Sequence, residues 1–88
     1  MVLVVSRVRW ACRRGMLELD WFLIRFFDRY YASLSLASQQ LFYELLQCED
    51  IELHSWFTGN AEPPVSFLAL VQEIKAAIAS LSDHEPLS

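Results

Sequence analysis

The sequence has few of the residues on which catalysis and metal binding usually depend. Its 88 residues include two cysteines, two histidines and two glycines. Cys12 and Cys48 have neither the number nor the spacing of a zinc site or a disulfide framework. His54 and His84 stand far apart without other ligand-type residues at metal-binding spacing, and no glycine-rich phosphate loop is present. We therefore expect reduced, packed cysteines, no metal site and no enzymatic activity.

Long hydrophobic runs are also absent. No apolar stretch approaches the roughly 20 residues that span a bilayer. The apolar segment Met1–Val5 is shorter than the core of a secretory signal, which is about 7–15 residues long. We therefore expect a cytoplasmic protein that does not insert into a membrane.

Positive charge is scarce after residue 30. Residues 1–30 carry six arginines and three acids, a net charge of +3, whereas residues 31–88 carry one lysine and eight acids, a net charge of −7. An acidic chain has no general affinity for nucleic acid. We expect no nucleic-acid partner, and any such binding would depend on the N-terminal arginines.

The apolar residues recur at helical rather than strand spacing, and they make up 55% of the chain. We predict a single all-α domain, 1–88, that forms a small five-helix bundle, with an ordered core over about 6–81 and uncertain tails at 1–5 and 82–88. The predicted helices are Ser6–Arg14 with Ser6 as N-cap, Met16–Leu34, Leu36–Cys48 with Ser35 as N-cap, Ile51–Thr58 with Asp50 as N-cap, and Phe67–Leu81.

The helical stripes also predict which side chains are buried. Trp21 lies off the main stripe, so we expect it to be exposed and to face a partner. The residues expected in the core are Trp10, Leu19, Leu23, Phe26, Phe42, Leu45, Leu53, Trp56, Val71 and Ile74.

The segment around Gly15 is the predicted contact surface. Arg14 falls where the first helix should end, and Gly15 can take the left-handed conformation that closes a helix. Glu18 and Asp20 fall in the opening turns of the second helix, where anions are favoured. Oppositely charged side chains thus flank Gly15, which has no side chain of its own. In an alternative, compatible interpretation, Arg14 and Glu18 pair with each other and Gly15 is only a helix cap.

The pattern Arg7-x-x-Trp10-x-x-x-Arg14-Gly15-Met16-x-Glu18-Leu19-Asp20 resembles the signature of the succinate dehydrogenase assembly factors that promote covalent flavin attachment. The resemblance continues through Asp50-x-x-Leu53-x-x-Trp56 and extends over about residues 7–79. It implies a small five-helix protein whose partner-binding residues are Arg14, Gly15 and Glu18, flanked by Arg7, Trp10 and Asp20.

The resemblance also implies a function. The protein would bind the flavoprotein subunit of succinate dehydrogenase, and also that of fumarate reductase, and stabilise the conformer in which FAD becomes covalently attached. We expect a monomer that binds no cofactor tightly itself and acts on FAD attachment in its partner. The alternative is a small helical DNA-binding or antitoxin-like regulator that uses the N-terminal arginines, which retardation of DNA at moderate salt would reveal.

Overall fold

A computed structural model describes residues 5–82, and over that range it contains five α-helices, one short 3₁₀ helix and no strand. The predicted all-α, five-helix fold is therefore confirmed. Of the predicted tails at 1–5 and 82–88, Val5 and Ser82 belong to helices, and the other residues lie outside the described range. The elements are α1 (Val5–Ala11), α2 (Leu17–Tyr30), η1 (Tyr31–Ser33), α3 (Leu36–Leu45), α4 (Asp50–Phe57) and α5 (Val65–Ser82).

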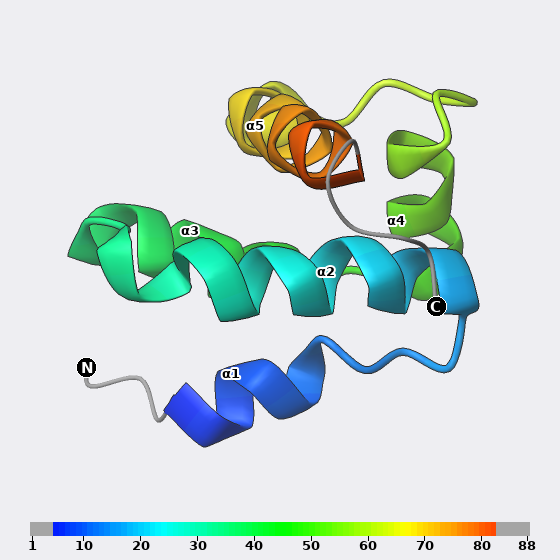
Figure 1. The fold of residues 1–88 in the computed structure, drawn as a ribbon. Coiled ribbons are helices and arrows are strands. Elements are labelled where there is room, and N and C mark those ends of the chain that lie inside the picture. Colours follow the sequence, from blue (N-terminus) through cyan, green and yellow to red (C-terminus); the bar gives the residue numbers. More distant parts are fainter. Residues whose placement is uncertain (1–4, 83–88) are drawn as a thin grey trace.

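Helix α2 is the central element (Figure 1). Helix α1 lies along one side of it and α5 crosses its other side, while α4 stands at its N-terminal end. Helix α5 also packs against α3 and α4. This arrangement brings the connection between α1 and α2 next to the start of α4. None of the described helices has the length and apolar character needed to cross a membrane.

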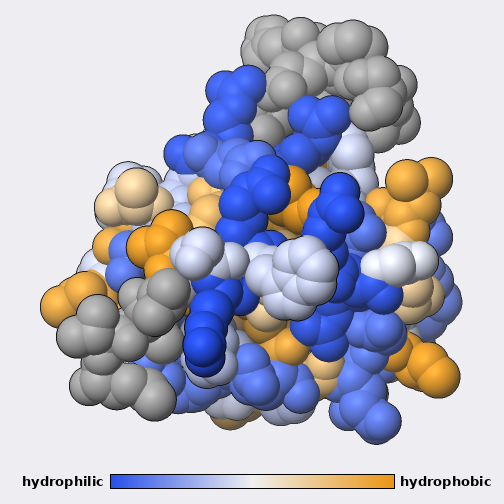
Figure 2. Space-filling model, turned by 90° about the horizontal axis from the view of Figure 1, so that it is seen from below, coloured by the Kyte–Doolittle hydropathy of each residue, from blue (hydrophilic) through white to orange (hydrophobic). Residues whose placement is uncertain are grey.

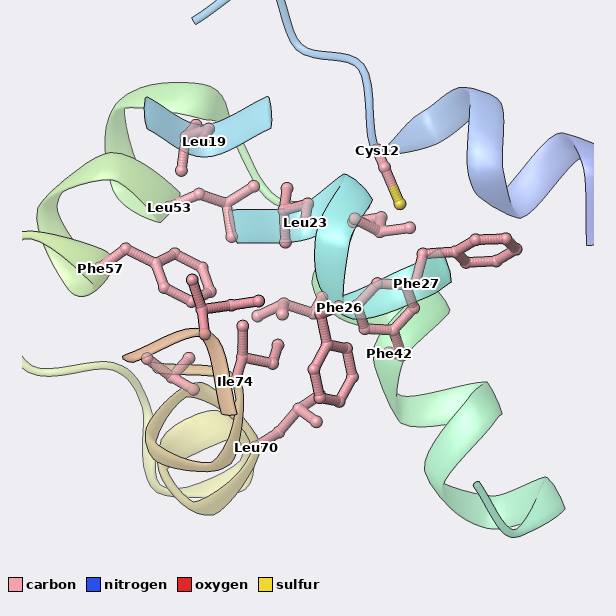
Figure 3. Close-up of a cluster of buried hydrophobic side chains, with 14 of the residues drawn as sticks. Cys12, Leu19, Leu23, Phe26, Phe27, Phe42, Leu53, Phe57, Leu70 and Ile74 are labelled. Carbon is pink, nitrogen blue, oxygen red and sulfur yellow. The ribbon is translucent and has the colours of Figure 1, made fainter. Parts of the chain in front are cut away.

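The core forms around the apolar stripe of α2, which presents Leu19, Leu23 and Phe26 inward. Figure 3 shows these side chains meeting others from α3, α4 and α5. Phe42 of α3 is fully buried, and its ring centroid lies 5.7 Å from that of Phe26. Such tilted aromatic pairs contribute about 0.5–1.5 kcal/mol beyond the area they bury. Because the whole inner face of α2 is packed, the direction of its first turn is well determined.

The predicted core is confirmed with one exception. Trp10 was expected in the core but is 75% exposed. Val8 and Cys12, four residues apart, are the buried residues of this segment. Trp10 is displaced from Val8 by about 200° around the helix, so it points to solvent. The confirmed core residues are Leu19, Leu23, Phe26, Phe42, Leu45, Leu53, Trp56, Val71 and Ile74.

The prediction for Trp21 is also wrong. Its side chain is half-buried and packs against the core, with its ring edge-on to Phe22 at 5.4 Å and the Arg25 guanidinium 5.4 Å from its centroid. Its indole nitrogen is buried and has no hydrogen-bond partner among the described residues. Trp21 is therefore a packing residue at the edge of the core.

Two of the three predicted N-caps differ from the structure. Helix α1 begins at Val5, so Ser6 lies within it. Helix α4 begins at Asp50 and its N-cap is Glu49. Only the cap of α3 is confirmed, because the Ser35 hydroxyl accepts a hydrogen bond of 3.1 Å from the Ser38 backbone N–H.

Several predicted helix ends also shift. Helix α1 ends at Ala11, three residues before Arg14, and α3 ends at Leu45 rather than Cys48. Helix α2 ends at Tyr30, and η1 occupies the turn that follows. Helix α5 begins at Val65, directly after two prolines. The early ends of α1 and α3 leave backbone carbonyls free, and the site described next uses them.

Candidate functional site

Gly15 lies in the connection between α1 and α2 and has the left-handed conformation that the sequence predicted, with φ of 83°. The backbone N–H of Arg13 donates to the Trp10 carbonyl over 3.1 Å as α1 ends. Gly15 is exposed, and a Cβ added there would meet no atom within 4 Å. The glycine is therefore required by backbone conformation, and the space above it is open to a partner.

The Arg14 side chain points into the protein and is 14% exposed. Its Nε donates to Asp50 Oδ1 over 2.6 Å. Its two terminal nitrogens donate to the carbonyls of Leu46, at 2.6 Å, and Cys48, at 2.7 Å, and one of them also donates to the Ala11 carbonyl at 3.0 Å. These carbonyls are left without helical partners because α1 and α3 have ended. Arg14 therefore joins the end of α1 to the turn between α3 and α4.

Asp20 supports the same turn from the other side. Its Oδ1 accepts a hydrogen bond of 2.6 Å from the backbone N–H of Arg14. Asp20 is half-buried and lies in the first turn of α2, where the helix dipole favours an anion. The backbone just before Gly15 is therefore held by the second helix as well.

Glu18 pairs with His54 of α4, whose Nε2 lies 2.9 Å from Glu18 Oε1. An ionised carboxylate only accepts hydrogen bonds, so the histidine nitrogen is the donor. The Glu18 side chain is 66% exposed and that of His54 is 31% exposed. The alternative in which Arg14 and Glu18 pair with each other is therefore wrong, because each has a different partner on α4.

The two pairs match in spacing. Arg14 and Glu18 are four residues apart, and so are their partners Asp50 and His54. Residues four apart on a helix lie one turn above each other on the same face. One face of α4 therefore contacts both charged residues of the Arg-Gly-x-x-Glu segment. Sequence reasoning did not include Asp50 and His54 in the site. The signal that could have identified them is their four-residue spacing, which equals that between Arg14 and Glu18.

The outer face of α1 presents Trp10 and Arg7 to solvent. Arg9 on the same helix pairs with Asp28 of α2 through two hydrogen bonds, of 2.9 Å and 3.0 Å. These bonds lower the pKa of Asp28 and raise that of Arg9. Figure 2 looks onto the side of the molecule on which α1 lies, where hydrophilic side chains gather at the centre and hydrophobic ones at the margins.

A shallow hollow of about 410 Å³ opens on this face of α1. It is lined by Ser6, Arg9, Trp10 and Arg13. An exposed tryptophan surrounded by arginines is typical of protein interfaces, in which both residue types are enriched.

The cysteines are free thiols, as predicted, and Cys12 is fully buried. Burial raises the pKa of the Cys12 thiol to about 12, and its Sγ–H donates to the Val8 carbonyl over 3.4 Å. Burial also raises the pKa of the half-buried Cys48. A raised pKa reduces the thiolate form that nucleophilic chemistry needs. Between residues 5 and 82, no three metal-ligating side chains of His, Cys, Asp or Glu form a group.

The predicted site residues thus fall into two sets. Arg14 and Asp20 point inward and hold the turn. The exposed set consists of Arg7, Trp10, Gly15 and Glu18. The structure therefore combines an internally bonded turn with a surface that carries an aromatic ring, a cation and an anion.

Comparison with known proteins identifies similar chains. Residues 6–78 match the family model described as "Flavinator of succinate dehydrogenase". The chain is 47% identical over 76 residues to the FAD assembly factor SdhE of Shewanella oneidensis, a match that covers 85% of this chain and 93% of the relative. It is 46% identical over 63 residues to the FAD assembly factor SdhE of Yersinia pseudotuberculosis, covering 72% of each chain.

Proposed function

Because the chain belongs to the family of flavinators of succinate dehydrogenase, we propose that it is a FAD assembly factor for the flavoprotein subunit of that enzyme. The observation that carries this conclusion is the family match over residues 6–78, which includes the complete Arg-Gly-x-x-Glu segment. The protein acts as an assembly factor and not as a catalyst. Family membership thus favours this hypothesis over the alternative of a DNA-binding regulator.

We propose that the docking surface consists of Gly15, Glu18, Trp10 and Arg7, all of which are exposed. The absence of a side chain at Gly15 allows the partner backbone to approach closely. Glu18 offers a charge-assisted hydrogen bond, and Trp10 offers a large apolar ring. A standard interface covers about 800 Å² per partner, about one seventh of the 5704 Å² surface of this protein.

Arg14 and Asp20 support this surface from inside. Arg14 has little capacity left for a partner, because four of its five N–H groups donate to protein oxygens. We therefore assign the motif arginine to holding the turn and the motif glycine and glutamate to contact with the partner.

The mechanism that fits such a protein is conformational selection. A protein that binds one conformer of its partner better than the others increases the population of that conformer. Alignment of the reacting groups within the partner then accelerates covalent attachment of the flavin. The assembly factor supplies binding energy and no reacting group.

We further propose that the protein acts as a monomer, retains no FAD itself and also serves the fumarate reductase flavoprotein. Gel filtration of the purified protein with excess FAD tests the first two statements. A dimer, or FAD that co-elutes with the protein, would contradict them. Adding fumarate reductase flavoprotein to the flavinylation assay described next tests the third.

The experiment that tests the function uses the two glycines of the chain as a matched pair. Gly15 and Gly59 have φ of 83° and 82°, and an added Cβ meets nothing within 4 Å at either position. Gly15→Arg and Gly59→Arg should therefore cost similar backbone strain, about 1–2 kcal/mol each. Purified apo-flavoprotein is incubated with FAD and each variant, and covalent flavin is measured by fluorescence in denaturing gels.

The wild-type protein and Gly59→Arg should both increase covalent flavin above the level with FAD alone. Gly15→Arg should remain folded and fail to do so, because a long side chain blocks the approach of the partner. A wild-type protein without effect would refute the proposed function. Equal activity of the two glycine variants would refute the assignment of Gly15 to the docking surface.

A further inference from the structure

Among the described residues, His54 is the one that forms a hydrogen bond with the Glu18 carboxylate, and its Nε2 lies 2.9 Å from Oε1. The contact joins α4 to the first turn of α2. Glu18 Oε2 is left without a bond from the described residues, and the Glu18 side chain is 66% exposed. One oxygen is therefore held by the protein, while the other has no hydrogen bond from the described residues and belongs to a largely exposed side chain.

The surroundings favour this pairing over others. Glu18 lies in the first turn of α2, where the helix dipole favours an anion, and His54 lies in the last turn of α4. Arg14, the nearest arginine in the sequence, is occupied by Asp50 and by backbone carbonyls. Glu18 is thus left to His54.

The contact has a consequence for binding. An exposed glutamate without a partner samples many rotamers and loses that freedom when it is ordered at an interface. The hydrogen bond from His54 orders the carboxylate before the partner arrives. Because His54 Nε2 uses only Oε1, Oε2 remains available as an acceptor.

We infer that His54 is a positioning residue of the docking surface: it holds the Glu18 carboxylate beside the Gly15 turn so that Oε2 faces the flavoprotein. This inference rests on the proposed function. The group that Oε2 accepts from is a backbone N–H or a basic side chain of the flavoprotein. His54 acts through Glu18, so its effect should disappear when Glu18 no longer carries a carboxylate.

The test compares two replacements of His54 in the full-length chain. His54→Phe keeps a flat ring and removes the donor, whereas His54→Gln keeps an N–H donor with a similar reach. Each is titrated against apo-flavoprotein and FAD, and the half-saturating concentration and maximal rate of covalent flavin formation are measured. Glu44→Gln on α3, where Glu44 accepts a hydrogen bond of 3.3 Å from Gln40, is the matched control for an exposed polar pair. Thermal melts give the folded fraction used to correct every concentration.

His54→Phe should raise the half-saturating concentration between about twofold and tenfold, the range expected for ordering one long side chain, and leave the maximal rate unchanged. His54→Gln should restore most of the loss, and Glu44→Gln should match the wild type. In the Glu18→Ala background, which has no side-chain acceptor for His54, His54→Phe should cause no further loss, a result that a general structural role of His54 would not explain.

Three results would overturn the inference: wild-type binding by His54→Phe, failure of His54→Gln to improve on His54→Phe, or a full additional loss in the Glu18→Ala background. These results differ from failure of the proposed function, in which the wild-type protein itself would not promote flavinylation.

Discussion

Replacement of Arg14 should destabilise the protein strongly, because its side chain is bonded internally. Arg14→Ala removes four hydrogen bonds and leaves the Asp50 carboxylate and the carbonyls of Leu46 and Cys48 without this donor. Breaking a buried ion pair by removing one partner costs about 3–5 kcal/mol. Asp50 is 40% exposed, so water can replace part of the lost bonding to its carboxylate. We therefore expect Arg14→Ala to lower the free energy of unfolding by about 3 kcal/mol.

That loss is large for a chain of this size. The usual stability per residue corresponds to about 4–13 kcal/mol for 88 residues. A loss of about 3 kcal/mol should lower the urea midpoint by about 1–3 M. Arg14→Lys should lie between the wild type and Arg14→Ala, because a single ammonium group cannot reach acceptors that lie in several directions.

The assay is urea unfolding followed by far-UV circular dichroism, with Arg13→Ala as the matched control. Arg13 is the adjacent arginine and is exposed, so its removal should change the free energy of unfolding by less than about 0.5 kcal/mol. If Arg14→Ala were as stable as Arg13→Ala and still failed to promote flavinylation, Arg14 would be a contact residue, and the reasoning from its internal bonds would be refuted.

Four further predictions concern partner binding, helix capping, thiol reactivity and the pH dependence of stability. Trp10→Ala should change the free energy of unfolding by less than about 0.5 kcal/mol. It should nevertheless weaken flavoprotein binding about tenfold or more, as for other exposed interface tryptophans. Unchanged binding would exclude Trp10 from the docking surface. Ser35→Ala should cost about 1 kcal/mol in urea unfolding through loss of the α3 cap, with flavinylation unaffected at saturating protein. A thiol reagent at pH 8 should modify native Cys48 much faster than Cys12, and equal rates would contradict the burial of Cys12. The Cys12 pKa is raised to about 12 in the folded state, so the free energy of unfolding should be constant below the ordinary thiol pKa and fall above it by up to about 1.4 kcal/mol per pH unit. Chemical unfolding between pH 8 and 10.5 should show this slope. Cys12→Ala should reduce the slope.

Much of the fold could be predicted because its signals are local. The apolar stripe of α2 repeats at helical spacing, so Leu19, Leu23 and Phe26 were correctly assigned to the core. Gly15 stands where one helix must end and another begin, and its positive φ followed from that position. The family resemblance likewise depends on spacing within one continuous segment.

Errors arose where two local preferences competed. Trp10 is large and apolar, but Val8 and Cys12 already define the buried stripe of α1, so Trp10 must face outward. Asp50 is a favourable cap residue, but it lies one position inside α4, where its carboxylate bonds to Arg14. Neither outcome follows from residue type alone.

The sequence by itself therefore determined the helices, the core of α2, the left-handed glycine and the family. Only the tertiary structure decided what the charged motif residues do, because their partners Asp50 and His54 lie 36 residues along the chain. Helical periodicity specifies which face of α4 is apolar, but the packing of that face against α2 decides which polar residues of α4 reach the Gly15 turn. That packing turns Arg14 inward and leaves Glu18 at the surface.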